Sequence, residues 1–106
     1  MPSFQKPSFG KSRRNQAGAL APDEAEAIGL SALLFLTEDE ARLTRFLSET
    51  GLSPADLGAA AARPEMLGAV LDYLLADESL LLVFAAHAAI EPGTIVPAQA
   101  ALAKAG

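Results

Sequence analysis

The chain contains no cysteine and no tryptophan, and it has one histidine and one tyrosine. Because cysteine is missing, the protein has neither a disulfide framework nor a thiolate metal site, a composition compatible with a reducing compartment. A glycine-rich phosphate loop and a paired nucleophile and base are also missing. We therefore expect a noncatalytic, cytoplasmic protein that holds no cofactor and no metal.

Long apolar runs are lacking as well. The longest extends from Leu80 to Ile90, contains His87, and is shorter than the roughly 18 residues that indicate a membrane span. The sequence therefore predicts that the protein does not enter a membrane.

Acidic residues are missing from the first 19 residues, although the whole chain has 13 acidic and 8 basic residues. This segment contains a tandem repeat, PSFQK followed by PSFGK, and its basic residues are Lys6, Lys11, Arg13 and Arg14. Proline, glycine, serine and lysine disfavour a packed core. We therefore expect a disordered basic tail over residues 1–19 and a single helical domain over residues 20–106.

Residues from 22 onward carry the start and stop signals of helices. Proline followed by acidic residues predicts a helix over 22–36, and a capping box at Thr37 with Gly51 at the end predicts a second over 38–50. Ser53 and Pro54 begin a third, short helix that ends near residue 63, where Pro64 begins a fourth. A last short helix is expected over about 98–103, after Pro97.

The stretch from 64 to 90 would form a helix of about 26 residues and about 39 Å if it were unbroken. Because a domain of this size has a diameter near 30 Å, we place a break at Ala76–Asp77, with Asp77 as the cap of the next helix. That helix, about 78–90, is apolar on nearly every side, which is typical of a buried central helix. The predicted fold class is therefore all-α, a compact orthogonal bundle of five to six short helices around this central helix.

Two groups of polar residues are candidate interaction residues. Arg42 and Arg45 share a helix face with two glutamates at spacings of three and four, which is either a solvated face or a binding strip. The second group stands near the predicted corner and consists of Asp72, Tyr73, Asp77 and Glu78. Its carboxylates suit a hard cation or acid–base chemistry, as well as helix capping and solvation. His87 lies on an apolar stripe, where we expect a partly buried structural role.

Several blocks of residues stand in a combination that is more specific than any block alone. They are Ala32-Leu33-x-Phe35-Leu36, Arg42-Leu43-x-Arg45-Phe46-Leu47-x-x-x-Gly51-Leu52, Leu67-x-x-Val70-Leu71-Asp72-Tyr73-Leu74-Leu75-x-Asp77-Glu78 and Phe84-Ala85. This combination resembles the domain of unknown function 3572 family of small bacterial, chiefly alphaproteobacterial, proteins. The resemblance covers roughly residues 25–92 and implies a cytoplasmic helical domain, without an activity, cofactor or partner. The chain departs from the family pattern at Gly58, Met66 and Ser79, where arginine, an aromatic residue and proline are expected.

Three functions remain open. The leading hypothesis is a noncatalytic interaction module, an acidic helical domain that binds a protein partner or itself, as in a homodimer, through an apolar groove or patch. The alternative is a nucleic-acid accessory protein whose Phe4 and Phe9 stack on bases while the four cations of the tail contact phosphates. The third is a carboxylate-based metal enzyme that uses Asp77 and Glu78.

Overall fold

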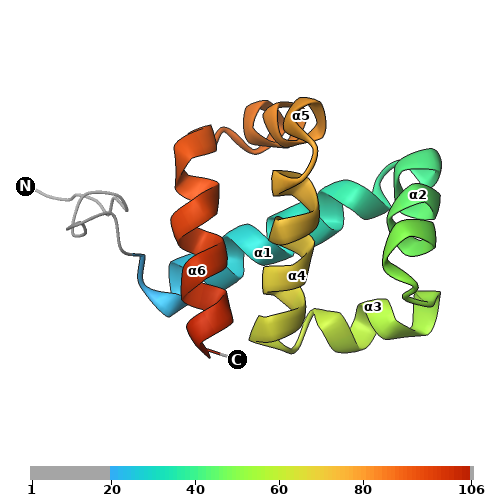
Figure 1. The fold of residues 1–106 in the computed structure, drawn as a ribbon, viewed down its shortest axis with the longest axis horizontal. Coiled ribbons are helices and arrows are strands. Elements are labelled where there is room, and N and C mark those ends of the chain that lie inside the picture. The colour runs from blue at the N-terminus through green and yellow to red at the C-terminus, as the bar shows by residue number, and fades with distance from the viewer. Residues whose placement is uncertain (1–19, 106) are drawn as a thin grey trace, which may run out of the picture.

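Four of the helical elements begin with proline in the computed structural model, which describes residues 20–105 (Figure 1). The elements are α1 (Pro22–Thr37), α2 (Glu40–Thr50), α3 (Pro54–Ala60), α4 (Pro64–Leu75), α5 (Glu78–Ala88), the 3-10 turn η2 (Pro92–Thr94) and α6 (Ile95–Ala105). Proline suits the first helical position because the N–H that it lacks has no partner in the helix there. No strand occurs within residues 20–105, and the predicted all-α bundle is confirmed. The predicted basic tail, residues 1–19, lies outside the described residues.

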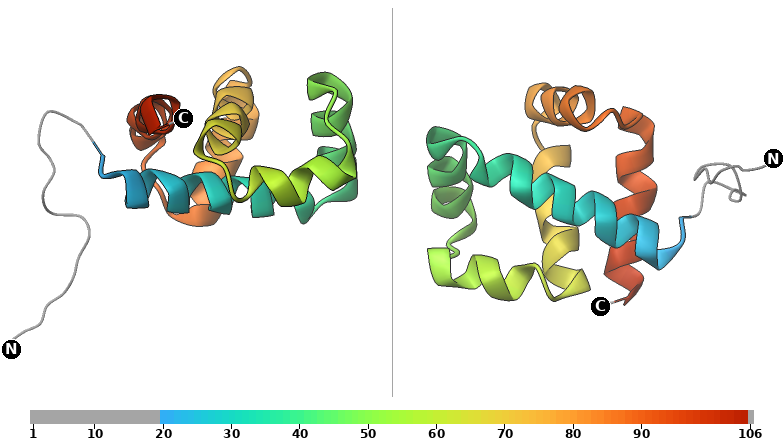
Figure 2. Two further views of the ribbon diagram at one scale, coloured as in Figure 1. Left: turned by 90° about the horizontal axis from the view of Figure 1, so that it is seen from below. Right: turned by 180° about the vertical axis from the view of Figure 1, so that it is seen from behind.

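The centre of the bundle is made by α1, α4 and α6. The helices α4 and α6 lie side by side, and α1 crosses the same side of both (Figure 2). The fully buried side chains of these three helices include Leu36, Leu71, Leu74, Ile95 and Leu102. In Figure 1, α2 and α3 extend beyond the end of α1 and return the chain to the start of α4.

The helix that was predicted to be central, over about 78–90, is found as α5, and its position differs from the prediction. It packs at the end of α4 and buries only Phe84 and Ala85, while Leu82 and Val83 are exposed. An apolar composition on all sides does not by itself bring neighbours to all sides. The centre of the hydrophobic core is formed instead by α1, α4 and α6.

The C-terminal helix α6 is longer and more deeply packed than the short helix predicted over 98–103. It begins at Ile95, before Pro97, and Ile95, Ala98 and Leu102 are fully buried. Pro97 is tolerated because it stands in the first turn, where its missing N–H costs no hydrogen bond of the helix. This helix supplies one side of the core.

Capping residues set the other boundaries. The predicted break at Ala76–Asp77 is confirmed, because Asp77 is the N-cap of α5 and its Oδ1 accepts a hydrogen bond from the amide of Leu80 at 3.1 Å. The cap of α2 is Asp39, which accepts from the amide of Arg42 at 3.1 Å. The prediction of Thr37 as that cap was wrong, because Thr37 is the last residue of α1 and its hydroxyl donates to the carbonyl of Leu34.

Candidate functional site

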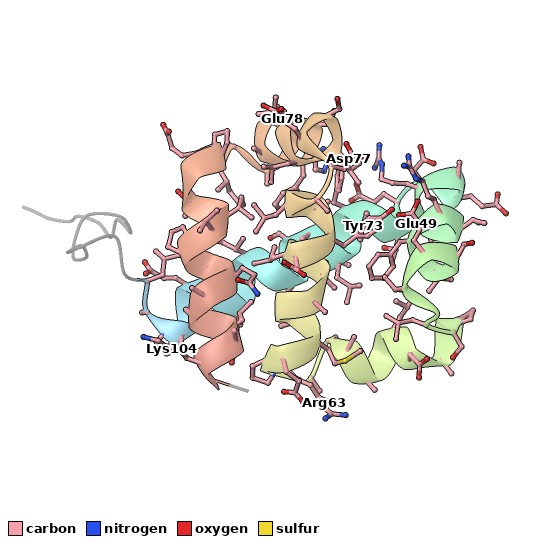
Figure 3. The ribbon with its side chains drawn as sticks, in the orientation of Figure 1. Glu49, Arg63, Tyr73, Asp77, Glu78 and Lys104 are labelled. Carbon is pink, nitrogen blue, oxygen red and sulfur yellow. The ribbon has the colours of Figure 1, made fainter. Side chains whose placement is uncertain are left out.

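A cleft of about 390 Å³ lies between α2 and the corner where α4 meets α5. We call it the corner cleft. It is lined by Arg45, Glu49, Tyr73, Ala76, Asp77, Glu78 and Ser79. Figure 3 shows Glu49, Tyr73 and Asp77 near one another at this end of the molecule, with Glu78 above α5. The cleft therefore joins four of the six residues proposed from the sequence: Arg45, Tyr73, Asp77 and Glu78.

The corner cleft is positioned by local packing and capping. Tyr73 is in the last turn of α4, and its ring meets the buried ring of Phe46 in α2 edge to face, with centroids 4.9 Å apart. This contact holds α2 beside the end of α4. Asp77 caps α5, so one of its carboxylate oxygens is already engaged by the amide of Leu80.

The charges of the corner cleft are largely paired with one another. The Nε of Arg45 donates to Glu49 at 2.9 Å, and a guanidinium nitrogen lies 4.0 Å from Asp77. The hydrogen bond with Glu49 is the main cause that raises the pKa of Arg45. Burial is the main cause that raises the pKa of Tyr73, and the negative charge of Glu49 adds to it. With three carboxylates and one guanidinium, the lining is suited to a cationic group rather than an anion.

The carboxylates of the proposed metal site are not brought together. Asp72 is exposed on α4 and does not line the corner cleft. Within residues 20–105, no group of three or more histidine, cysteine, aspartate or glutamate side chains is arranged to hold a metal ion. The structure thus places Asp77 and Glu78 as the cap and first residue of α5.

Arg42 lies away from the corner cleft and joins α1 to α2. Its Nη1 donates to the backbone carbonyl of Phe35 at 3.0 Å, and its guanidinium carbon lies 4.0 Å from the centroid of the Phe35 ring. Its side chain also pairs with Asp39 at 3.9 Å. These contacts give Arg42 a structural role at the start of α2.

The exposure of apolar side chains on α1 and α5, two helices in contact, was not predicted from the sequence. There, Nε2 of His87 lies 3.3 Å from Oε1 of Glu38. His87 is exposed and not partly buried as expected. Leu34 and Val83 each stand one helical turn before a member of this pair, and they are 61% and 51% exposed. We call the exposed residues Leu30, Leu34 and Glu38 of the α1 end and Val83 and His87 of α5 the α1–α5 face.

Aromatic packing holds the two helices of the α1–α5 face together. The ring of Phe35 in α1 lies 5.3 Å from that of Phe84 and 5.6 Å from that of His87. The spacing of Leu30, Leu34 and Glu38, four residues apart, is the sequence signal for this face. It lies outside the strip of small residues, Ala25, Gly29 and Ala32, which packs into the core.

A model of one protein family, described as Protein of unknown function (DUF3572), matches residues 22–105. The chain belongs to this family. The match confirms the resemblance drawn from the sequence and extends it through α6, and it brings the DUF3572 protein no activity. No curated protein and no solved structure matches the chain.

The helices were also compared with the length and composition of membrane spans. No single helix among residues 20–105 is long and apolar enough to cross a membrane, and α5 with the segment Pro92–Lys104 reaches the criterion only as a pair bent by 106°. The four cations of the proposed nucleic-acid contact, in the first 19 residues, lie outside the described part of the chain.

Proposed function

We propose that this DUF3572 protein is a noncatalytic protein-binding module of the cytoplasm. Its α1–α5 face would take an apolar segment of a partner protein that also carries basic residues. The observation that carries the proposal is the exposure of Leu34 and Val83 on two contacting helices, each one helical turn before a residue of the Glu38–His87 contact.

The apolar side chains provide the affinity. Fully burying a leucine or valine side chain contributes about 1.5–3 kcal/mol, and more than half of each side chain remains to be buried. Exposed apolar residues that gather on one surface, with polar groups at the edge, are typical of protein-binding surfaces. A helix or an extended segment laid between α1 and α5 would cover Leu34 and Val83 together.

Charge indicates the chemistry of the partner. Residues 20–106 hold all 13 acidic residues of the chain and only four of its basic residues, and three of these, Arg42, Arg45 and Arg63, pair with carboxylates. The negative surface attracts a basic segment and repels a second acidic copy. A partner protein therefore suits the face better than a second copy of this chain.

The corner cleft is a less suitable docking site than the α1–α5 face. Its Arg45 is engaged by Glu49, and its Asp77 is engaged as a helix cap. A ligand there would have to replace interactions that already exist, which lowers the net gain in free energy. The apolar atoms of Leu34 and Val83 give up only contact with water.

The test compares the whole wild-type chain with two variants. Leu34→Ser/Val83→Ser removes the apolar side chains of the face, and Val96→Ser is the matched control, because Val96 is 58% exposed on α6. Each protein is immobilised and exposed to native cytoplasm, and the retained proteins are quantified. We expect a partner that wild type and Val96→Ser retain and the double variant loses.

Sedimentation at several concentrations tests self-association in the same three proteins. If wild type forms dimers as its concentration rises and the double variant does not, the face binds a second copy of this chain and not a partner protein. If all three proteins retain the same set and sediment as monomers, the α1–α5 face is not a docking site. Circular dichroism verifies that the substitutions of exposed residues leave the helices intact.

A further inference from the structure

We propose that α2 and α3 form one cooperative unit that opens from the folded core of α1, α4 and α6 and closes on it again. We call residues 39–63 the α2–α3 arm. When it is closed, the arm completes the corner cleft with Arg45 and Glu49. When it is open, it uncovers the parts of α1 and α4 that it packs against. The two states therefore present different surfaces, and the inference goes beyond the proposed function because it does not depend on Leu34 or Val83.

The arm buries little of its own length. Among residues 39–63 only Phe46 and Ala60 are buried, whereas α1 buries six residues and α4 buries five. The other apolar side chains that the arm packs against the core are only partly buried, and they are Leu43, Leu47, Leu52 and Leu57. Because apolar burial is the main favourable contribution to folding, a segment with so few buried side chains opens at a lower free energy than the core.

The position of the arm allows it to open while the core stays folded. The helices α4 and α6 lie side by side with α1 across both, and the arm lies on the far side of α4 from α6 (Figures 1 and 2). Removing the arm therefore leaves Ile95 and Leu102 of α6 packed against α1 and α4. The core keeps the three helices that bury most of its side chains.

Both ends of the arm have the backbone of a hinge. Asp39 follows the end of α1 and has a φ of −129°, and Arg63 precedes α4 and has a φ of −126°, so both are extended residues between helices. Asp39 caps α2 with its own side chain, and Pro64 begins α4 without an amide hydrogen to donate. Residues at the ends of elements absorb the change of direction in hinge motions. The arm can thus open without breaking a turn of α1 or α4.

The specific contacts that hold the arm closed are concentrated on α2. The ring of Phe46 meets that of Tyr73 at 4.9 Å, and Arg42 donates to the carbonyl of Phe35 at 3.0 Å. A guanidinium nitrogen of Arg45 lies 4.0 Å from Asp77, which is the limit of an ion pair. Because α3 follows α2 in the chain and adds only one buried residue, loss of these contacts releases both helices together.

Native-state hydrogen exchange of the whole chain measures the opening. Released helices of 11 and 7 residues are too short to persist in water, so their amides exchange in the open state. At low urea concentrations, the amides of α2 and α3 should share one protection factor and one urea dependence. This protection factor should be at least about 10-fold below those of Leu71 in α4 and Leu102 in α6.

Ile95→Val provides the decisive comparison, because Ile95 is fully buried in α6 and the substitution weakens the core alone. It should accelerate exchange in α4 and α6 by roughly 2- to 10-fold. Exchange in α2 and α3 should not change, since the core is folded in both the closed and the open state. Phe46→Leu is the matched variant in the arm. It should accelerate exchange in the arm and in the core by the same factor, because it weakens the closed state relative to both the open and the unfolded states.

A thiol reagent gives a second readout that does not depend on unwinding of the helices. The protein has no cysteine, so Ala60→Cys in the arm and Ala98→Cys in α6 each introduce one thiol at a position that is at most 1% exposed. Modification should be at least about 10-fold faster at residue 60 than at residue 98, because only residue 60 is uncovered when the arm opens. Circular dichroism of both variants verifies that they are folded.

Three results would overturn the inference. If Ile95→Val accelerates exchange in the arm and in the core equally, the arm opens only when the whole domain unfolds. Different urea dependences for α2 and α3 would show that they are not one unit, and equal modification of the two cysteines would show that the arm is not released. None of these measurements needs a partner, so their outcome is independent of whether the α1–α5 face captures one.

Discussion

A Cβ atom on Gly29 of α1 would lie 2.8 Å from the Cβ of Leu67 in α4. The same atom would lie 3.3 Å from Cδ1 of Leu102 in α6, so Gly29 stands where the three central helices meet. Side-chain carbons do not approach this closely without a shift of the helices. The absence of a side chain at Gly29 thus sets the distance between α1 and α4, and through it the shape of the core.

Gly29→Ala should lower the free energy of unfolding by up to about 2 kcal/mol, because an overpacking cost of about 1–3 kcal/mol outweighs the gain of about 1 kcal/mol that alanine brings to a helix. Gly58→Ala in α3 is the matched control, since a Cβ there has nothing within 4 Å. We expect it to raise the free energy of unfolding by about 0.5–1 kcal/mol. Urea denaturation measures both variants, and a stabilised Gly29→Ala would contradict the close packing of α1 on α4.

Arg42→Ala should lower the free energy of unfolding by about 1–3 kcal/mol, because it removes a charged hydrogen bond to the carbonyl of Phe35 and the contact with its ring. Arg42→Lys should recover only part of the lost stability. A planar guanidinium stacks on the Phe35 ring and donates a hydrogen bond at the same time, whereas an ammonium group is not planar and does not stack. Arg63→Ala is the control, because Arg63 is exposed and pairs with Glu65, two residues away in the chain. We expect it to change the stability by less than about 1 kcal/mol in the same denaturation experiment. Similar losses for Arg42→Ala and Arg63→Ala would remove the structural role of Arg42.

The stability of α3 should decrease at low pH because of Asp56. The amide of Ser53 donates to this carboxylate at 2.8 Å and its hydroxyl at 3.0 Å, and these bonds lower the pKa of Asp56 below its ordinary 3.8. Because the pKa is lower in the folded state, the stabilisation is present above the unfolded pKa and is lost as the pH falls through the folded one. Asp56→Asn should therefore have a lower melting temperature than wild type at about pH 7, and the difference in melting temperature should shrink at about pH 2–3. A difference that is independent of pH would rule out this origin.

The local boundaries of the helices were accessible from sequence, whereas the identity of the central helix was not. Asp77 was recognised as a cap because an unbroken helix from 64 to 90 exceeds the diameter of the domain, and the cap is found. The importance of α6 was missed because Pro97 and the many alanines of this segment indicated only a short helix at the end of the chain. Ile95 and Leu102 are nonetheless fully buried against α1 and α4. Burial depends on which side of a helix its neighbours cover. The sequence of an evenly apolar helix such as α5 has no amphipathic pattern that would indicate this side.

The candidate surfaces show the same division. Tyr73, Asp77 and Glu78 were grouped because they flank one corner, and they line one cleft. That Arg45 and Glu49 complete this cleft depends on the packing of Phe46 against Tyr73, which no local signal specifies. The exposure of Leu34 and Val83 likewise follows from how α1 and α5 cross, and composition alone counts both residues toward a core.

Tyr73 provides a spectroscopic test of the corner cleft, because it is the only tyrosine and the chain has no tryptophan. Its tyrosinate absorbance should report a pKa above the ordinary 10.0, chiefly because of burial and further because of the nearby carboxylate of Glu49. Glu49→Gln should lower the pKa of Tyr73 relative to wild type, since it removes a negative charge and leaves Arg45 to stabilise the tyrosinate.

Glu40→Gln is the control for this titration, because Glu40 has no part in the lining of the corner cleft and should leave the pKa of Tyr73 unchanged. Circular dichroism recorded at each pH verifies that the helices persist while the phenol ionises. If Glu49→Gln and Glu40→Gln shift the pKa of Tyr73 equally, general charge acts on the ring and α2 does not hold Glu49 beside it. A shift confined to Glu49→Gln shows that α2 and the α4–α5 corner form one electrostatic unit in solution.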